Sequence, residues 1–292
     1  MHALAGGLQA WSTLAPDGSP APTFDTSGRN FSLAVRAQRH TPVVTAAELQ
    51  QRAAGGADVV VLDTRTLPEY SHQHVPGAIA VPAAELLLRL SDLVPSPDTQ
   101  VVVSCAGLPR AILGAQTLID AGLPNPVAYL EDGTAGWIRA GLPLETGATH
   151  LYGPASRAAR ENGARLARQL AQRNPPPQPI AEIDLDTARA WQADGQRTTY
   201  LLDVRTPAEF EASHLPGTLS SEGGQLVAVS HRTIAVRGAR VVLIDDPAGA
   251  RAQVVAHWLS QRGHGYEIAI LRHDFAAGQN TPRQEEAETA AG

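Results

Sequence analysis

The chain has 292 residues, of which 43% are hydrophobic, and a formal net charge of −6. The length is typical of about two domains, each with enough apolar side chains for a packed core. The negative charge argues against general nucleic-acid binding and against docking on an anionic membrane. All 23 side chains counted as Lys or Arg are arginines, which excludes a phosphate-loop lysine or a Schiff-base lysine.

A single cysteine, Cys105, rules out an internal disulfide and favours a reducing compartment. No apolar run is long enough to cross a bilayer. The first residues also lack the basic start and long apolar core of a signal peptide. We therefore expect a cytoplasmic protein that neither spans nor binds a membrane.

The first 27 residues contain a short match to a later segment. LAGGLQAW (residues 4–11) and LEDGTAGW (130–137) share a leucine, a glycine and a tryptophan at the same positions. We interpret residues 1–27 as the remnant of the C-terminal end of an upstream repeat. Chance similarity is the alternative.

Residues 28–40 are expected to be a connector, after which an α/β pattern begins. Thr45 can cap a helix, with Glu48 at the capping-box position. A polar segment, residues 67–74, follows the first buried strand. The expected helices are 46–54, 83–90 and 132–140, and the expected strands are 59–62, 75–79 and 125–130.

The central stretch is VVVSCAGLPRAILGAQTLIDAG, residues 101–122. Val101–Val103 predict a buried strand, and residues 111–121 a helix that Gly122 ends. Cys105 lies between them, where the loop amides and the positive end of the helix meet. We expect a lowered thiol pKa, with Arg110 as an adjacent cation. The alternative is a small buried hydrophobic residue, as most lone cysteines are.

The second half of the chain repeats the first. An arginine-rich helix over 151–173 and the stiff segment NPPPQP (174–179) are expected to separate them. LDTRTLPEYSHQHVPGAI (62–79) then aligns without gaps with LDVRTPAEFEASHLPGTL (202–219). This agreement is strong evidence for a duplication.

Carrying the alignment forward places Asp245 at the position of Cys105. The second loop is one residue longer, and Arg251 then matches Arg110. The second copy thus keeps the scaffold and lacks the nucleophile. Asp245 and Asp246 are expected to cap its loop, and no ligand spacing indicates a metal site.

In this order, these motifs resemble the rhodanese family over about residues 42–145 and 180–275. The residues that carry the resemblance are Asp63, Arg65, HVPGA (74–78), the Cys105 loop and GTAGW (133–137). The resemblance implies an α/β fold of two rhodanese-like domains, each a central, mainly parallel sheet flanked by helices. The domains implied are 28–150 (catalytic), 151–179 (linker), 180–276 (degenerate) and 277–292 (disordered tail).

The resemblance also implies a sulfurtransferase in which Cys105 becomes a persulfide. A donor such as thiosulfate would supply the sulfur, and cyanide, a small thiol or a protein thiol would accept it. No cofactor or metal is implied. The expected substrate-binding residues, which present backbone N–H groups, are Ala106, Gly107, Leu108, Pro109 and Arg110.

Several neighbours of the loop are assigned roles on the same basis. Asp63 and Arg65 are expected to form an ion pair that supports the loop. Arg110 either binds an anionic donor or pairs with a carboxylate. His74 is expected to be a hydrogen-bonded structural residue rather than a base, and Trp137 a core residue.

Leu108 departs from the glycine or anion-suited residue that many relatives carry, which favours an apolar or protein-bound donor.

Two other functions are possible alternatives. A Cdc25-type phosphatase or arsenate reductase would have five residues between cysteine and arginine, whereas this loop has four. A non-catalytic binding or regulatory module is the other alternative. The second copy is expected to pack over the first and shape access to Cys105.

Overall fold

A computed structural model describes residues 10 and 28–275 of the chain. The segments interpreted as an upstream remnant (1–27) and as a disordered tail (277–292) lie outside the described residues, apart from Ala10. No helix within the described part is long and apolar enough to cross a membrane.

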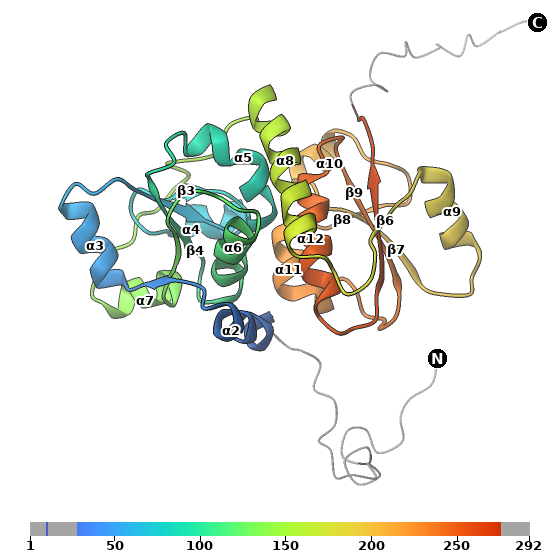
Figure 1. The fold of residues 1–292 in the computed structure, drawn as a ribbon, viewed down its shortest axis with the longest axis horizontal. Coiled ribbons are helices and arrows are strands. Elements are labelled where there is room, and N and C mark those ends of the chain that lie inside the picture. Colours follow the sequence, from blue (N-terminus) through green and yellow to red (C-terminus); the bar gives the residue numbers. More distant parts are fainter. Residues whose placement is uncertain (1–9, 11–27, 276–292) are drawn as a thin grey trace, which may run out of the picture.

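Two α/β repeats follow one another along the described chain (Figure 1). The first contains α2 (Gly28–Arg39), β1 (Val43–Val44), α3 (Ala46–Ala54), β2 (Val59–Asp63), α4 (Leu67–His72), β3 (Ile79–Ala80), η1 (Ala83–Glu85), α5 (Leu86–Leu93), β4 (Gln100–Ser104), α6 (Pro109–Asp120), β5 (Val127–Leu130) and α7 (Gly133–Arg139). Helix α8 (Arg157–Arg173) connects it to the second. The second contains β6 (Ala181–Glu182), α9 (Leu185–Ala193), β7 (Thr199–Asp203), α10 (Pro207–Ala212), β8 (Leu219–Ser220), α11 (Gly223–Val229), η2 (Ser230–Arg232), β9 (Arg240–Asp245), α12 (Ala250–Ser260) and β10 (Glu267–Arg272).

Each repeat has a five-stranded sheet whose strands all pair in parallel. The orders are β1-β5-β4-β2-β3 and β6-β10-β9-β7-β8, so the second sheet reproduces the first strand for strand. The register repeats as well, because Asp63 pairs with Ser104 and Asp203 with Ile244. The predicted fold class is confirmed. Cys105, which follows Ser104, therefore occupies the same position in the first repeat as Asp245, which follows Ile244, in the second.

Three segments differ from the sequence expectations. Residues 28–40 are largely helix α2 and pack against α6, rather than forming an open connector. The polar segment after β2 contains the short helix α4, which a Thr66 capping box begins. The helix expected from residue 151 begins only at Arg157, because the Ser156 side chain caps its first turn and is itself bound to Asp92.

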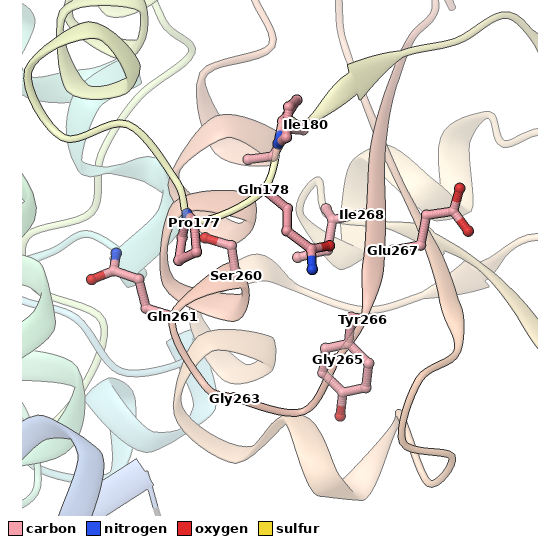
Figure 2. Close-up of a pocket in the computed structure, with 11 residues that line it drawn as sticks. Pro177, Gln178, Ile180, Ser260, Gln261, Gly263, Gly265, Tyr266, Glu267 and Ile268 are labelled. Carbon is pink, nitrogen blue, oxygen red and sulfur yellow. The ribbon is translucent and has the colours of Figure 1, made fainter.

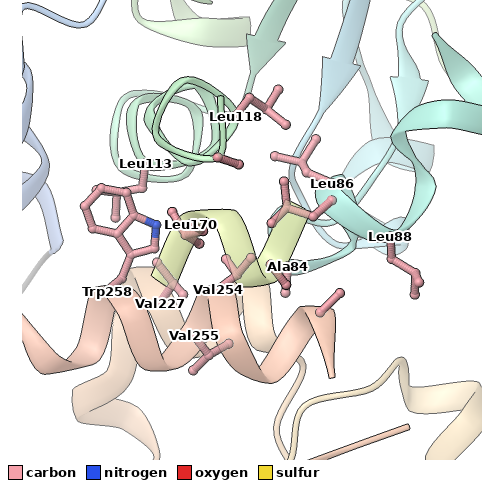
Figure 3. Packing of buried hydrophobic residues seen from close by; sticks show 14 of the residues in the cluster. Ala84, Leu86, Leu88, Leu113, Leu118, Leu170, Val227, Val254, Val255 and Trp258 are labelled. Atoms are coloured by element: carbon pink, nitrogen blue, oxygen red, sulfur yellow. The ribbon is translucent and has the colours of Figure 1, made fainter. Parts of the chain in front are cut away.

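The repeats share one hydrophobic core (Figure 3). Helices α6 and α8 present Leu113 and Leu170 to Val254 and Trp258 of α12, while Leu118 on the other side of α6 points toward Leu86. The Trp258 indole N–H donates to the Thr117 hydroxyl at 2.8 Å, which satisfies the polar atom of a fully buried ring. The second repeat therefore packs against α6, the helix that follows the cysteine loop.

Candidate active site

Cys105 follows directly after the last residue of β4 and is 1% exposed. The chain then passes through a short loop into α6, whose first helical residue is Pro109. Proline suits this position because its fixed φ matches the helix and its missing N–H is not needed there. It follows that Pro109 shapes the loop and cannot donate a hydrogen bond to a substrate, contrary to its expected part in the amide cradle.

The start of α7 holds the cysteine loop from the other side. The Thr134 N–H donates to the Cys105 carbonyl at 2.9 Å, and the Ala135 N–H donates to that of Ala106 at 3.4 Å. Gly133 lies so close that an added Cβ would fall 1.9 Å from the Cys105 carbonyl oxygen. Sequence reasoning noted Gly133 only as part of a motif and did not foresee this contact with the nucleophile's own backbone.

The electrostatics of the thiol differ from expectation. Burial raises the pKa of Cys105, although the charge of Arg110 and the amides of Gly107 and Ala111 act in the opposite direction. The Gly107 N–H lies 3.4 Å from the sulfur. The prediction of a lowered pKa is wrong, because it counted the amides and the arginine and omitted the desolvation of the sulfur.

Several amides of the loop remain available for an incoming negative charge. In the described chain, the backbone N–H groups of Ala106, Leu108 and Arg110 donate to no protein acceptor. A side chain built onto Gly107 would meet nothing within 4 Å, so the loop has open space beside it. Unpaired amides at the start of a helix are a favourable environment for an anion.

Arg110 is bound to a carboxylate rather than left free for a donor. Its two terminal nitrogens donate to the two oxygens of Glu69 at 2.6 and 2.7 Å. Glu69 also completes the capping box of Thr66 at the start of α4. Burial raises the pKa of Glu69, but the bonds and charge of Arg110, together with Thr66, outweigh it and hold the pKa at about 2. The pair is therefore ionised at neutral pH and ties the loop to α4.

The expected ion pair of Asp63 and Arg65 is present behind the loop. The two side chains are buried and are joined by hydrogen bonds of 2.7 to 3.1 Å. Arg65 also donates to the Gln73 carbonyl at 2.6 Å. Between them, Thr64 donates from its amide and its hydroxyl to the Ser104 carbonyl, one residue before the cysteine. This arrangement fixes the end of the strand that presents the thiol.

His74 and Trp137 have the structural roles expected of them. The His74 ring is buried, stacks on Tyr70 with 3.8 Å between ring centroids, and hydrogen bonds to the Tyr70 carbonyl and the Thr149 hydroxyl. The buried Trp137 donates to the Pro143 carbonyl at 2.9 Å. Neither side chain has a hydrogen bond to the cysteine loop.

Leu108 belongs to the buried hydrophobic core and is 5% exposed. Its side chain therefore anchors the loop to the interior. The expectation that a leucine at this position favours an apolar or protein-bound donor stays a prediction.

The second repeat shows the same loop with a carboxylate inside it. Asp245 accepts from the amides of Asp246, Arg251 and Ala252 at 2.8 to 3.0 Å, and from the Arg251 guanidinium at 2.8 Å. Burial raises the pKa of Asp245 to about 6, so it is still a carboxylate at neutral pH. The matching amides of the first repeat are those of Ala106, Arg110 and Ala111. The expected capping role of Asp245 is confirmed, and its loop shows that this backbone can bind one negative charge.

Arg251 extends this arrangement across the two repeats. It is fully buried and donates to Glu209 at 2.7 Å, as Arg110 does to Glu69. It also donates to Glu85 of the first repeat at 3.0 Å. The correspondence of Arg251 with Arg110 is confirmed, while its bond to the other repeat was not foreseen.

A separate hollow of about 360 Å³ lies between the linker and the end of α12 (Figure 2). Pro177, Ile180 and Tyr266 are among the residues that line it. None of the cysteine-loop residues lines it, so it is not part of the candidate active site. No group of three or more His, Cys, Asp or Glu in the described ranges is arranged to hold a metal.

A lone thiol at the carboxyl end of a parallel strand, followed by unpaired amides and a helix, defines a class of α/β proteins with a cysteine nucleophile loop. A family model described as the Rhodanese-like domain matches residues 45–140 and again 184–281. The chain belongs to this family, and it contains the domain twice.

Three relatives give further detail. A thiosulfate sulfurtransferase from Pseudomonas aeruginosa has a solved structure that is 46% identical, with a TM-score of 0.80, over 86% of this chain and 46% of that one. An HTH-type transcriptional regulator of Mycobacterium tuberculosis is 40% identical over 38% of this chain and 47% of its own length. A sulfurtransferase of Allochromatium vinosum is 31% identical over 33% of this chain and 87% of its own length. The chain spans about half the length of the first two.

Proposed function

We propose that the chain is a sulfurtransferase that carries sulfur as a persulfide on Cys105. The observation that supports this best is the loop of the second repeat, where three amides and an arginine surround the Asp245 carboxylate. The same amides in the first repeat lie around a thiol and have no carboxylate between them. A persulfide on Cys105 would extend one atom beyond the sulfur and bring its negative charge to these donors.

The reaction divides into two steps that each move one sulfur atom. The Cys105 sulfur attacks the outer sulfur of thiosulfate, a new S–S bond forms, and the old S–S bond breaks with its electron pair leaving on sulfite. The thiol proton leaves with the sulfite as hydrogen sulfite, so the first step yields Cys–S–S⁻ and HSO₃⁻. In the second step an acceptor thiolate attacks the outer sulfur, and Cys105 leaves as the thiolate.

The raised pKa of Cys105 bears on the first step. The resting thiol is protonated at neutral pH, so it must lose its proton as the donor binds. Arg110 is neutralised by Glu69, and this leaves the loop amides as the groups that stabilise the developing charge. Backbone amides are effective here because they are already oriented and need no reorganisation during the step.

Two relatives named as sulfurtransferases support this assignment over the phosphatase alternative. The loop also encloses only four residues between Cys105 and Arg110, which suits a single sulfur better than a tetrahedral oxyanion. A second candidate function is a rhodanese-like module that binds or regulates without catalysis, and the relative named as a transcriptional regulator supports it.

The test is the formation of thiocyanate from thiosulfate and cyanide by the full chain. We expect turnover that Cys105→Ser abolishes, and no hydrolysis of an aryl phosphate under the same conditions. Aryl phosphate hydrolysis that depends on Cys105 would support the phosphatase. An unreactive Cys105 in a folded protein would support the binding module.

A further inference from the structure

The two repeats form a partly open cavity of about 750 Å³ that adjoins the start of α4, and none of the cysteine-loop residues lines it. The first turns of α4 and α10, which are equivalent elements of the two repeats, form two of its walls. Its apolar lining includes Leu67, Pro68, Tyr152 and Pro207. The volume is typical of a site for a small organic molecule rather than for a bare ion.

The cavity is connected to the cysteine loop through α4. Glu69 lies in the same helix turn as the lining residue Pro68, and it holds Arg110 of the loop at 2.6 Å. Gln225 of the second repeat donates to Glu69 at 3.2 Å. Gln225 lies three residues after Glu222, a further lining residue, so both repeats supply side chains around the Arg110–Glu69 pair.

Most charged groups on the cavity wall already have partners. Arg89 donates to Glu85 and to the Gly153 carbonyl, both at 2.8 Å. Arg160 is bound to Asp246 at 2.8 Å and Glu209 to Arg251 at 2.7 Å. Because these side chains are already paired, they stabilise the wall of the cavity and have few hydrogen-bonding groups left for a ligand.

Of the two charged lining residues that remain, Glu211 is exposed to solvent, whereas Glu222 is not. It is half-buried, and no hydrogen bond or ion pair to its carboxylate is found in the described part of the chain. Burial and the nearby carboxylates of Glu85 and Glu69 raise its pKa to about 7, with Arg110 opposing them. A partly desolvated carboxylate without a partner is costly, and a cationic ligand would offset that cost.

We propose that this cavity binds the sulfur acceptor, and that the acceptor is a small thiol with a cationic amine whose ammonium group pairs with Glu222. The charge of Glu222 favours a cation and disfavours a dianionic donor such as thiosulfate, so the cavity serves the second step rather than the first. The inference rests on the proposed function. Chemically, the acceptor thiolate attacks the outer sulfur of the Cys105 persulfide, its new S–S bond replaces the old one, and Cys105 leaves as the thiolate.

The experiment separates the two steps. The full chain is loaded with thiosulfate, freed of excess donor and mixed with 2-aminoethanethiol, 2-mercaptoethanol or mercaptoacetate at pH 8. The loss of the persulfide is followed by intact-mass spectrometry, and each rate is corrected for the thiolate fraction of the thiol. We expect the cationic thiol to react fastest and the anionic one slowest. In Glu222→Gln the rate with 2-aminoethanethiol should fall about tenfold, as expected for the loss of a charged hydrogen bond, while the neutral thiol changes little.

Glu161→Gln is the matched control, because it makes the same charge change at an exposed residue of α8 outside the cavity lining. It should leave all three rates unchanged. The inference is overturned if Glu222→Gln changes the three rates by one common factor or not at all. If Cys105 does not load, the proposed function fails, and binding of 2-aminoethanethiol to Cys105→Ser is measured by ligand-observed NMR. Binding that Glu222→Gln abolishes supports the site, and equal or absent binding overturns it.

Discussion

Replacing Gly133 by alanine tests how strictly α7 positions the nucleophile. The new Cβ would lie 1.9 Å from the Cys105 carbonyl oxygen, whereas ordinary contact begins at about 3.4 Å, so the two must separate by about 1.5 Å. The φ of +52° adds a left-handed conformation that alanine adopts at a cost of about 1 kcal/mol. With an overpacking cost of about 2 kcal/mol, the total loss of unfolding free energy is about 3 kcal/mol.

The effect on catalysis follows from the same displacement. A shift of about 1 Å in a reacting group can cost about 100-fold in rate, so sulfur loading of Cys105 in Gly133→Ala should slow by about that factor. Loading is measured by quenched-flow mass spectrometry and stability by urea unfolding. Gly141→Ala is the control, because it has a φ of +75° and open space around its Cβ. It should lose about 1 kcal/mol and load normally. Equal loading rates in the two variants would refute this account of the loop.

Three further predictions concern charge. Glu69 has a pKa of about 2 against an ordinary 4.5, so its ionised form stabilises the fold above pH 4.5, and this contribution is lost as the pH falls towards 2. The unfolding free energies of wild type and Glu69→Gln, measured in urea, should therefore differ at pH 6 and converge near pH 2. A difference that stays constant with pH would contradict this assignment. Because burial raises the pKa of Cys105, its alkylation by iodoacetamide should be slow at pH 7 and should accelerate with a midpoint above that of a free small thiol, and a midpoint below that of the free thiol would contradict the direction. Asp245→Asn should lower the unfolding free energy by about 3 kcal/mol, because it removes the carboxylate from a fully buried pair with Arg251. An unchanged unfolding free energy in urea would show that the pair contributes nothing to stability.

The local pattern of the sequence was sufficient for the fold and for much of the site. Alternation of buried strands and helices predicted an α/β fold, and the resemblance to the rhodanese family implied the parallel sheets. The match between the copies, with one extra residue in the second loop, aligned Asp245 with Cys105 and Arg251 with Arg110. The ion pair of Asp63 with Arg65 was also predictable, because residues two positions apart at a strand end are held close together by local geometry. Such features depend on contacts close in sequence or repeated within it.

Features that depend on packing between distant segments could not be predicted. The pKa of Cys105 depends on how completely its surroundings exclude water, and nothing in the loop sequence specifies that. The partner of Arg110 was left open, because Glu69 lies 41 positions earlier and approaches only when α4 folds against the loop. The bond from Arg251 to Glu85 was hidden for the same reason, since it joins the two repeats.

The central claim is that Cys105 carries a sulfur atom between donor and acceptor. It is tested most directly by intact-mass spectrometry of the full chain after incubation with thiosulfate and removal of the excess. The account predicts a mass gain of one sulfur atom per chain, which peptide mapping places on Cys105, which cyanide removes, and which Cys105→Ala lacks. A folded wild-type chain that gains no sulfur, or that gains it equally without Cys105, would contradict the account.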